Sequence, residues 1–234
     1  MRSKFWKRAI FPLLLTGVFA ASVFSLFAGE DVSYLDAACT FEGKNPGCLD
    51  SLPEWNSGLR HFDSVLLKTE DTTAALNSLL WNFWRLEFAG DGLSAQPSSV
   101  LPLSVLKKRT SGCMGTVFLA LMVGEARRLR MEPVLLPGHV FFRVNGKNEE
   151  PNRKGFHYSD EEYRQKYADG PWTGFEFSPL SAKRFLGLVA FNLGNASRNE
   201  SASVALSWYQ VASELFPEYP GIAANRRILL EKQR

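Results

Sequence analysis

The sequence predicts an α+β fold in which one buried helix packs on a small antiparallel sheet. An uninterrupted apolar run follows Cys113 and reaches Gly124, which is typical of a central helix. The strand-like run 140–144 leads into Asn145-Gly146, a dipeptide typical of two-residue hairpin turns. From Ser181 onward, apolar residues recur at helical spacing to the end of the chain.

Length and composition favour one globular domain with appended segments. The chain has 234 residues, of which 45% are hydrophobic and 22% charged, so it can bury a sizeable core. Four of the 27 basic residues precede position 9, which leaves 23 basic against 24 acidic side chains in the rest of the chain. This balance excludes the basic surface of a nucleic-acid-binding protein, and we expect no DNA or RNA partner.

Residues 1–28 are expected to form a signal-anchor segment. The run 9–28 carries no ionisable group and follows four basic residues, and a membrane-spanning helix needs about 20 apolar residues. We expect membrane attachment through residues 9–28 in the bacterial inner membrane, with the globular part in the periplasm. Cleavage after Ser22 or Ser25 would instead give a secreted protein. A globular part that faces the cytoplasm is a third alternative.

Residues 29–68 are rich in Gly, Pro, Asp and Asn and show no sustained period, which indicates an exported linker. Cys39 and Cys48 lie nine positions apart within this linker. In an oxidising compartment they are expected to form a disulfide, which leaves Cys113 as the odd cysteine; the alternative is two free thiols in a flexible tether. Three apolar residues are available to dock the linker onto the core: Trp55, Leu59 and Phe62.

The core is expected to occupy residues 69–178. Asp71 is placed to cap a helix whose apolar residues recur every three or four positions up to Trp84, and Gly90 is placed to end it. The stretch 89–102 is rich in Gly, Ser and Pro and is expected to be a loop.

Cys113 opens the predicted central helix between Gly112 and Gly115. A helix N-terminus and a nearby imidazolium both stabilise a thiolate, so a cysteine at this position is expected to have a lowered pKa. The alternative interpretation is a small buried residue that begins a packed helix.

His139 opens the strand that leads to the hairpin turn. With a two-residue turn at Asn145-Gly146, His139 opposes Asn152 across the hairpin. Because side chains alternate with period two, Glu150 and Asn152 both project from the face that carries His139. Either residue is a candidate to hold the imidazole in its productive tautomer.

Together these residues resemble the transglutaminase-like superfamily, whose papain-like core carries a cysteine at a helix start, a histidine on a strand and an acidic or amide residue on the next strand. More narrowly, the chain resembles the SirB-type branch, which joins such a core to a short TPR-like tail. The matching pieces are Leu76-Asn77, Glu87-Phe88-Ala89-Gly90-Asp91, Val105 to Arg109, the helical run 119–129 and Pro137-Gly138-His139.

The resemblance implies thiol acyl transfer on a peptide or protein substrate. Cys113 would attack an amide carbonyl, His139 would move the proton, and Glu150 or Asn152 would orient His139. Water as the acyl acceptor would make the protein a peptidase or amidase, and a lysine would make it a crosslinking enzyme. Many SirB-type proteins lack the cysteine, so an inactive protein-binding module is the alternative. The usual aspartate-proline is replaced by Glu150-Pro151.

Residues 179–234 are expected to form a helical TPR-like tail that packs on the core and offers a surface for a protein partner. The acidic run 160–162, followed by Tyr163, Tyr167 and Trp172, predicts a short helix and an aromatic loop beside the strands. We interpret these as a solvated face with packing aromatics; a substrate rim is the alternative. His157 is interpreted as a surface residue, and the alternative is that it lines the cleft. No group of His, Cys, Asp and Glu has metal-site spacing, so no metal and no cofactor are expected.

Overall fold

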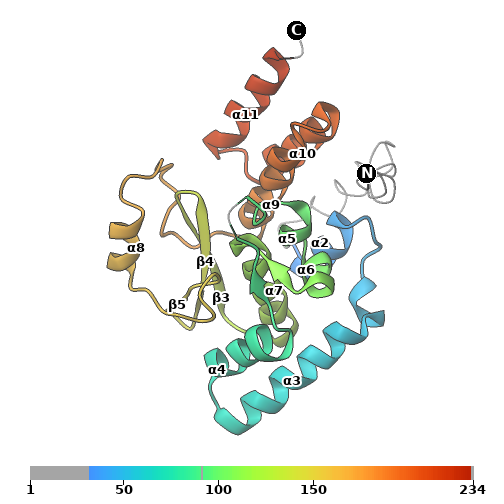
Figure 1. Ribbon diagram of the computed structural model, residues 1–234, viewed down its shortest axis with the longest axis vertical. Helices are drawn as coiled ribbons and strands as arrows, with labels where there is room; N and C mark the ends of the chain where they lie inside the picture. Colours follow the sequence, from blue (N-terminus) through green and yellow to red (C-terminus); the bar gives the residue numbers. More distant parts are fainter. Residues whose placement is uncertain (1–31, 91, 233–234) are drawn as a thin grey trace, which may run out of the picture.

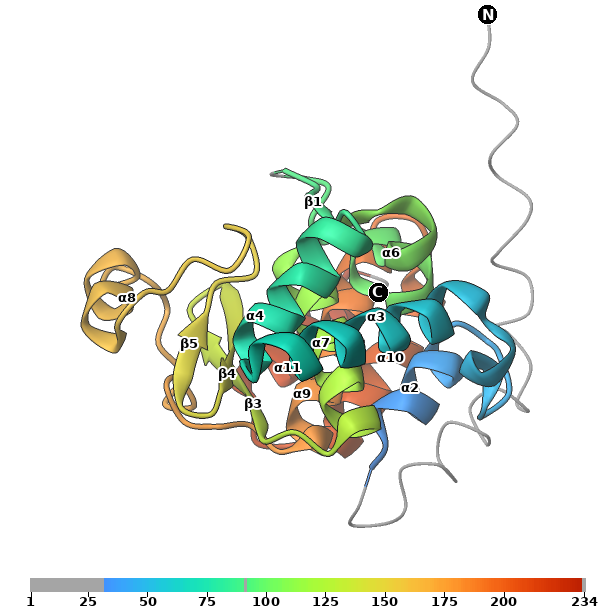
Figure 2. The same ribbon diagram turned by 90° about the horizontal axis from the view of Figure 1, so that it is seen from below.

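The computed structural model describes residues 32–90 and 92–232 (Figure 1). A helical body surrounds one central helix, α7, and a three-stranded sheet lies along one side of that helix (Figures 1 and 2). Helix α8 lies beyond the sheet, on the side away from the helical body. The predicted α+β class is confirmed.

The elements follow one another with short connections. The N-terminal half contains α2 (Tyr34–Phe41), the 3-10 turn η2 (Cys48–Ser51), α3 (Pro53–Thr69), α4 (Thr72–Asn77), the π-helical turn η3 (Ser78–Phe83), β1 (Glu87–Phe88), α5 (Pro97–Val100), α6 (Pro102–Lys108) and β2 (Thr110–Ser111). The second half contains α7 (Cys113–Arg127), β3 (Met131–Leu136), β4 (His139–Val144), β5 (Lys147–Glu149), α8 (Asp160–Lys166), α9 (Ala182–Ser197), α10 (Ala202–Leu215) and α11 (Pro220–Glu231).

Helix α7 is the centre of the core because it is apolar on every side. Its buried residues run without a break from Met114 to Gly124. Gly124 allows β3 to approach, since a Cβ at this position would lie 2.6 Å from the sulfur of Met131. The helix ends at Arg128, whose φ of 53° closes the last turn. The predicted central helix is therefore confirmed.

The turn between β4 and β5 sets the register of these two strands in the antiparallel sheet β3–β4–β5. Asn145 and Gly146 have φ values of 50° and 82°, as a two-residue turn of type I′ requires. Val144 consequently pairs with Lys147, which confirms the predicted two-residue turn. This register fixes which side chains share the face of His139, because a one-residue slip would turn them all to the other face.

The segment predicted to be a linker is folded. Helix α3 is 17 residues long and buries Trp55, Leu59 and Phe62 against the core. Their spacing of four and three is helical, and Pro53 occupies the first turn, where a proline is tolerated. Cys39 of α2 and Cys48 of η2 form a disulfide whose Cα atoms are 5.8 Å apart.

The prediction of a single-pass inner-membrane protein is corrected. Within the described ranges, no helix is both long and apolar enough to cross a membrane. The longest, α3, has 17 residues and carries charged side chains, whereas about 20 apolar residues are needed. Residues 9–28, on which the prediction of an anchor rested, lie outside the described residues.

Asp71 caps α4 as predicted. Its Oδ1 accepts hydrogen bonds from the backbone N–H groups of Thr73, at 2.9 Å, and Ala74, at 3.1 Å. The helical path continues through η3 and turns at Arg85, which has a φ of 53°, so it ends before Gly90. The stretch predicted to be a loop before α6 contains the one-turn helix α5.

The chain from Ser181 to residue 232 is helical, as predicted. Two glycines of α9 allow α10 and the residue that follows it to pack closely against α9. A Cβ at Gly194 would collide with the ring of Tyr209, and one at Gly187 would lie 2.7 Å from Cβ of Phe216. This interlocking of small and large residues holds α9 and α10 together, and α11 projects beyond them (Figure 1).

Candidate active site

Cys113 is the first residue of α7, and the backbone around it holds its thiol in place. Gly112 is the N-cap, and a side chain there would collide with the carbonyl of Ser94. The half-buried thiol accepts hydrogen bonds from the backbone N–H groups of Met114 and Val140. The first of these lies in the first turn of α7, where unpaired N–H groups and the helix dipole favour a negative charge.

His139 connects the thiol to a carboxylate. It begins β4, is only 6% exposed, and its Nε2 lies 3.0 Å from Oε2 of Glu150. The imidazole also shares a hydrogen bond with Cys113, and because Nε2 is engaged, Nδ1 is the ring nitrogen left for the thiol. The three side chains thus form the series of nucleophile, base and orienting group that a thiol enzyme uses.

Glu150 rather than Asn152 contacts His139. The Glu150 side chain accepts three hydrogen bonds: Oε2 accepts from His139 and, at 2.9 Å, from the hydroxyl of Tyr163, and Oε1 accepts from the backbone N–H of Asn152 at 2.9 Å. Asn152 therefore supports the carboxylate through its main chain. Its side-chain Oδ1 is buried and has no hydrogen-bond partner among the described residues.

The series favours a thiolate beside an imidazolium. Burial raises the pKa of the Cys113 thiol, but the hydrogen bond and the charge of His139 outweigh burial, and the net shift is downward. Burial lowers the pKa of His139, while the hydrogen bonds and charges of Cys113 and Glu150 bring it up to about 9. Burial likewise raises the pKa of Glu150, and the hydrogen bond from His139 reverses this, so Glu150 remains ionised.

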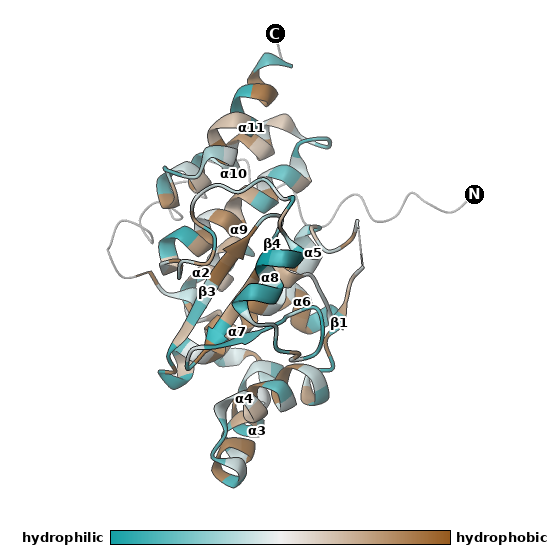
Figure 3. Ribbon diagram, turned by 90° about the vertical axis from the view of Figure 1, so that its left-hand side faces the viewer, coloured by the Kyte–Doolittle hydropathy of each residue, from teal (hydrophilic) through white to brown (hydrophobic). Residues whose placement is uncertain are grey.

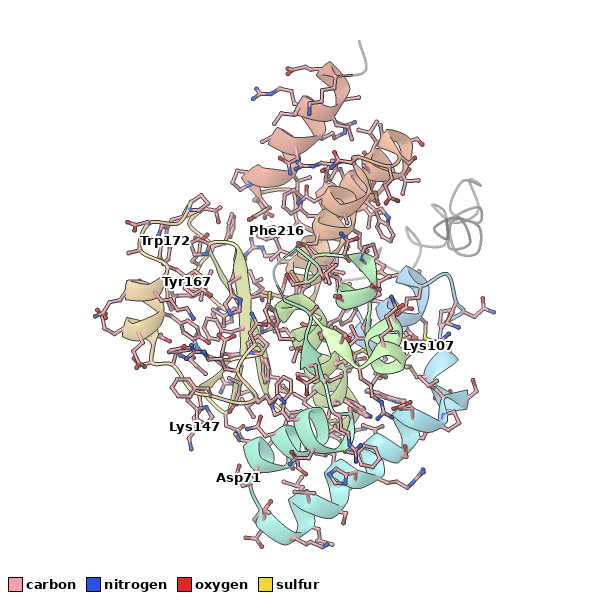
Figure 4. All side chains as sticks on the ribbon, in the orientation of Figure 1. Asp71, Lys107, Lys147, Tyr167, Trp172 and Phe216 are labelled. Carbon is pink, nitrogen blue, oxygen red and sulfur yellow. A yellow bond between two sulfur atoms is a disulfide. The ribbon has the colours of Figure 1, made fainter. Side chains whose placement is uncertain are left out.

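Helix α8 lies on the outer side of the sheet whose strand β4 carries His139 (Figure 3). Tyr163 is fully buried and stacks on Phe141 with ring centroids 4.3 Å apart. Tyr167, which is labelled in Figure 4, stacks on His139 with centroids 5.4 Å apart and planes 3° apart. The sequence favoured packing roles for both tyrosines, with a substrate rim as the alternative; their spacing of four residues was the signal that they face the same target.

His157 lies outside the series. Its side chain is 53% exposed, and its Nδ1 lies 2.8 Å from the carbonyl of Asn148 and 3.3 Å from Oε1 of Glu149. His157 lines an open cavity of about 870 Å³ between the β4–β5 hairpin and the α8 side of the sheet, and neither Cys113 nor His139 lines that cavity. No group of three or more His, Cys, Asp and Glu side chains in residues 32–90 and 92–232 is arranged to hold a metal ion.

Comparisons of the chain with protein families, with curated proteins and with solved structures found no match.

Proposed function

We propose that the protein is a thiol hydrolase or acyl transferase that acts on peptide or amide bonds through Cys113, His139 and Glu150. The observation that supports this proposal is the position of His139, which hydrogen-bonds a half-buried thiol on one side and a buried carboxylate on the other. A purely structural histidine has no need of a thiol whose pKa is lowered.

The proposed reaction has two halves. The Cys113 thiolate attacks the carbonyl carbon, and the oxyanion that forms is met by the backbone N–H of Cys113 at the start of α7. His139 then gives its proton to the leaving amine as the C–N bond breaks, which leaves a thioester. In the second half, His139 takes a proton from water or from an acceptor amine, and the attack of this acceptor releases the thiolate.

The same arrangement supports the resemblance to the transglutaminase-like superfamily and its SirB-type branch, which we retain as a proposal. Under this proposal α9, α10 and α11 form a TPR-like tail that binds a protein partner. The disulfide between Cys39 and Cys48 supports an oxidising compartment for the folded part.

The test is to trap the thioester. The full chain is incubated with a library of activated peptide acyl donors and quenched in acid, and its intact mass is measured. We expect the mass to increase by one acyl group in the native protein and to remain unchanged in Cys113→Ser. Glu162→Gln, which removes an exposed charge on α8, is the matched control and should acylate normally. Absence of acylation by every donor in the native protein would contradict the proposal.

The acceptor is identified in the same experiment. Addition of a primary amine either captures the acyl group as a new amide, which indicates a transferase, or leaves only the free acid, which indicates a hydrolase. Both products are resolved by mass spectrometry.

A second candidate function is protein binding without catalysis. It is favoured by the open cavity beside the hairpin, because its charged lining belongs to a different part of the sheet from the candidate site: Arg143, Lys147, Asp160 and Arg164. If this function is the correct one, Cys113 will titrate like a free thiol, and substitutions of Lys147 rather than of Cys113 will weaken capture of a partner.

A further inference from the structure

Two tyrosines at α8 contact the His139–Glu150 pair in different ways. Tyr163 lies within the helix and Tyr167 is its C-cap, whose backbone N–H donates to the carbonyl of Tyr163 at 3.0 Å, and both rings lie near His139. Tyr163 reaches the carboxylate: its hydroxyl is 2.9 Å from Oε2 of Glu150. Tyr167 covers the imidazole, and the planes of the two rings are almost parallel.

We propose that Tyr163 and Tyr167 are positioning residues that set the proton affinity of His139 in opposite directions, Tyr163 through Glu150 and Tyr167 through the face of the ring. This inference rests on the proposed function, because it concerns the base of that reaction.

The Tyr163 hydroxyl competes with His139 for one oxygen. An ionised carboxylate only accepts hydrogen bonds, so both the hydroxyl and the imidazole Nε2–H donate to Oε2 of Glu150. A second donor on this oxygen withdraws negative charge from the bond to His139, and Glu150 then holds the imidazolium less strongly. Removal of the hydroxyl is expected to raise the proton affinity of His139.

The ring of Tyr167 acts from the other side. A protonated imidazole that lies over an aromatic face is attracted by the electrons of that ring, and a neutral imidazole is attracted less. The half-buried ring also keeps water from one face of His139, which opposes this attraction, so a variant that keeps an apolar cover isolates the aromatic contribution. Removal of the aromatic ring is therefore expected to lower the proton affinity of His139.

Hydrogen bonds at the start of α8 fix the position of the helix and with it both tyrosine contacts. Arg143 forms two hydrogen bonds of 3.0 Å with Asp160 at the start of the helix. The Ser159 and Glu162 side chains complete a capping box at the same end. The helix is thereby anchored to β4, the strand that carries His139 (Figure 3).

Five ionisable groups bear on the test. Those around His139 are Cys113 from α7, Glu150 after β5, Tyr163 from α8 and Tyr167 at the C-cap of α8, with Tyr158 packed behind Tyr163. Tyr158 offers the matched control, because its ring lies 5.1 Å from that of Tyr163 and, among the described residues, makes no ring contact with His139. Tyr158→Phe removes a hydroxyl from the same aromatic cluster.

The experiment measures the apparent pKa of His139 by NMR titration of the imidazole resonances in the full chain. The chain has three histidines, so His61→Gln and His157→Gln assign the signals. Tyr167→Leu keeps an apolar cover and should lower the proton affinity about two- to five-fold, and Tyr167→Phe should restore it. Tyr163→Phe should raise the proton affinity about two- to twelve-fold. Tyr158→Phe should leave it unchanged.

The outcomes separate this inference from the proposed function. A native His139 that titrates near its ordinary value of about 6.5 contradicts the proposed function itself. A raised native pKa, together with variants that all shift in one direction or not at all, retains the proposed function and overturns the role of the tyrosines. If Tyr163→Phe does not fold, equal pKa values in Tyr167→Leu and Tyr167→Phe overturn the proposal on their own.

Discussion

Replacement of Glu150 by glutamine tests how the carboxylate supports the site. Three donors converge on this side chain, from His139, Tyr163 and the backbone of Asn152. Glutamine offers one acceptor oxygen and one NH₂ group, so at least one donor must face another donor. The substitution therefore removes a charge and also leaves a buried donor unpaired.

The expected magnitude follows from these contacts. A hydrogen bond to a charged group is worth about 1.5–3 kcal/mol, and one pKa unit is worth about 1.36 kcal/mol. The pKa of His139, which is about 9 in the native protein, is expected to fall by about one to two units in Glu150→Gln. The imidazolium beside Cys113 should then lose its proton about one to two pH units earlier than in the native protein, so the thiolate–imidazolium pair is lost at a lower pH.

The assay is the apparent pKa of His139 from NMR titration of the imidazole resonances, with thermal unfolding measured in parallel to confirm that the variant is folded. Glu162→Gln is the control, because it makes the same chemical change at an exposed position where glutamine also serves in a capping box. A folded Glu150→Gln in which His139 titrates at the native pKa would refute the reasoning, because Glu150 would then contribute nothing to the proton affinity of His139.

Three further predictions concern stability. Burial raises the pKa of Glu149 to about 7, so between pH 4.5 and pH 7 the folded state retains a proton that the unfolded state loses. The free energy of unfolding should therefore fall by about 3 kcal/mol as the pH rises through this range. Glu149→Gln should abolish this pH dependence in urea unfolding measured from pH 4 to pH 8. Cys48→Ser opens a loop that spans nine positions and should lower the free energy of unfolding by about 2.5 kcal/mol; loss of the same amount after simple reduction of the native protein checks the cause. Gly112→Ala places a methyl group against the Ser94 carbonyl. The variant should lower the free energy of unfolding in urea by about 1–3 kcal/mol and slow alkylation of Cys113. Native values for both would show that the loop around Ser94 moves away at no cost.

The sequence carries enough local information to predict the geometry of the hairpin. Asn145-Gly146 specifies a two-residue turn, and the alternation of side chains then puts position 150 on the face of His139. Side-chain alternation puts Glu150 and Asn152 on the same face, so it cannot tell which of them contacts His139. The chain leaves the ladder after Glu149 and turns back so that Glu150 pairs with Phe156, which leaves Glu150 as the side chain that reaches the imidazole.

Helix α3 could not be predicted from local sequence patterns. The glycines and prolines of residues 29–68 suggested a linker, but Gly58 of α3 is required by a distant residue: a Cβ at this position would collide with the indole ring of Trp84. Trp84 stacks on Trp55 with centroids 5.9 Å apart. The contact between Gly58 and Trp84 joins positions 26 residues apart, so no local period reveals it. For the same reason the sequence did not show that Tyr163 and Tyr167 contact Glu150 and His139.

The measurement that tests the central claim most directly is the pH dependence of alkylation at Cys113 in the native chain and in His139→Ala. The chain has three cysteines, and two of them form a disulfide, so iodoacetamide reports on Cys113 without further substitution. We predict rapid alkylation of the native protein at pH 6, and a His139→Ala variant whose rate rises only near the ordinary cysteine pKa of about 8.5. Identical profiles in the two proteins, both with the midpoint of a free thiol, would contradict the thiolate–imidazolium pair on which the proposed function depends.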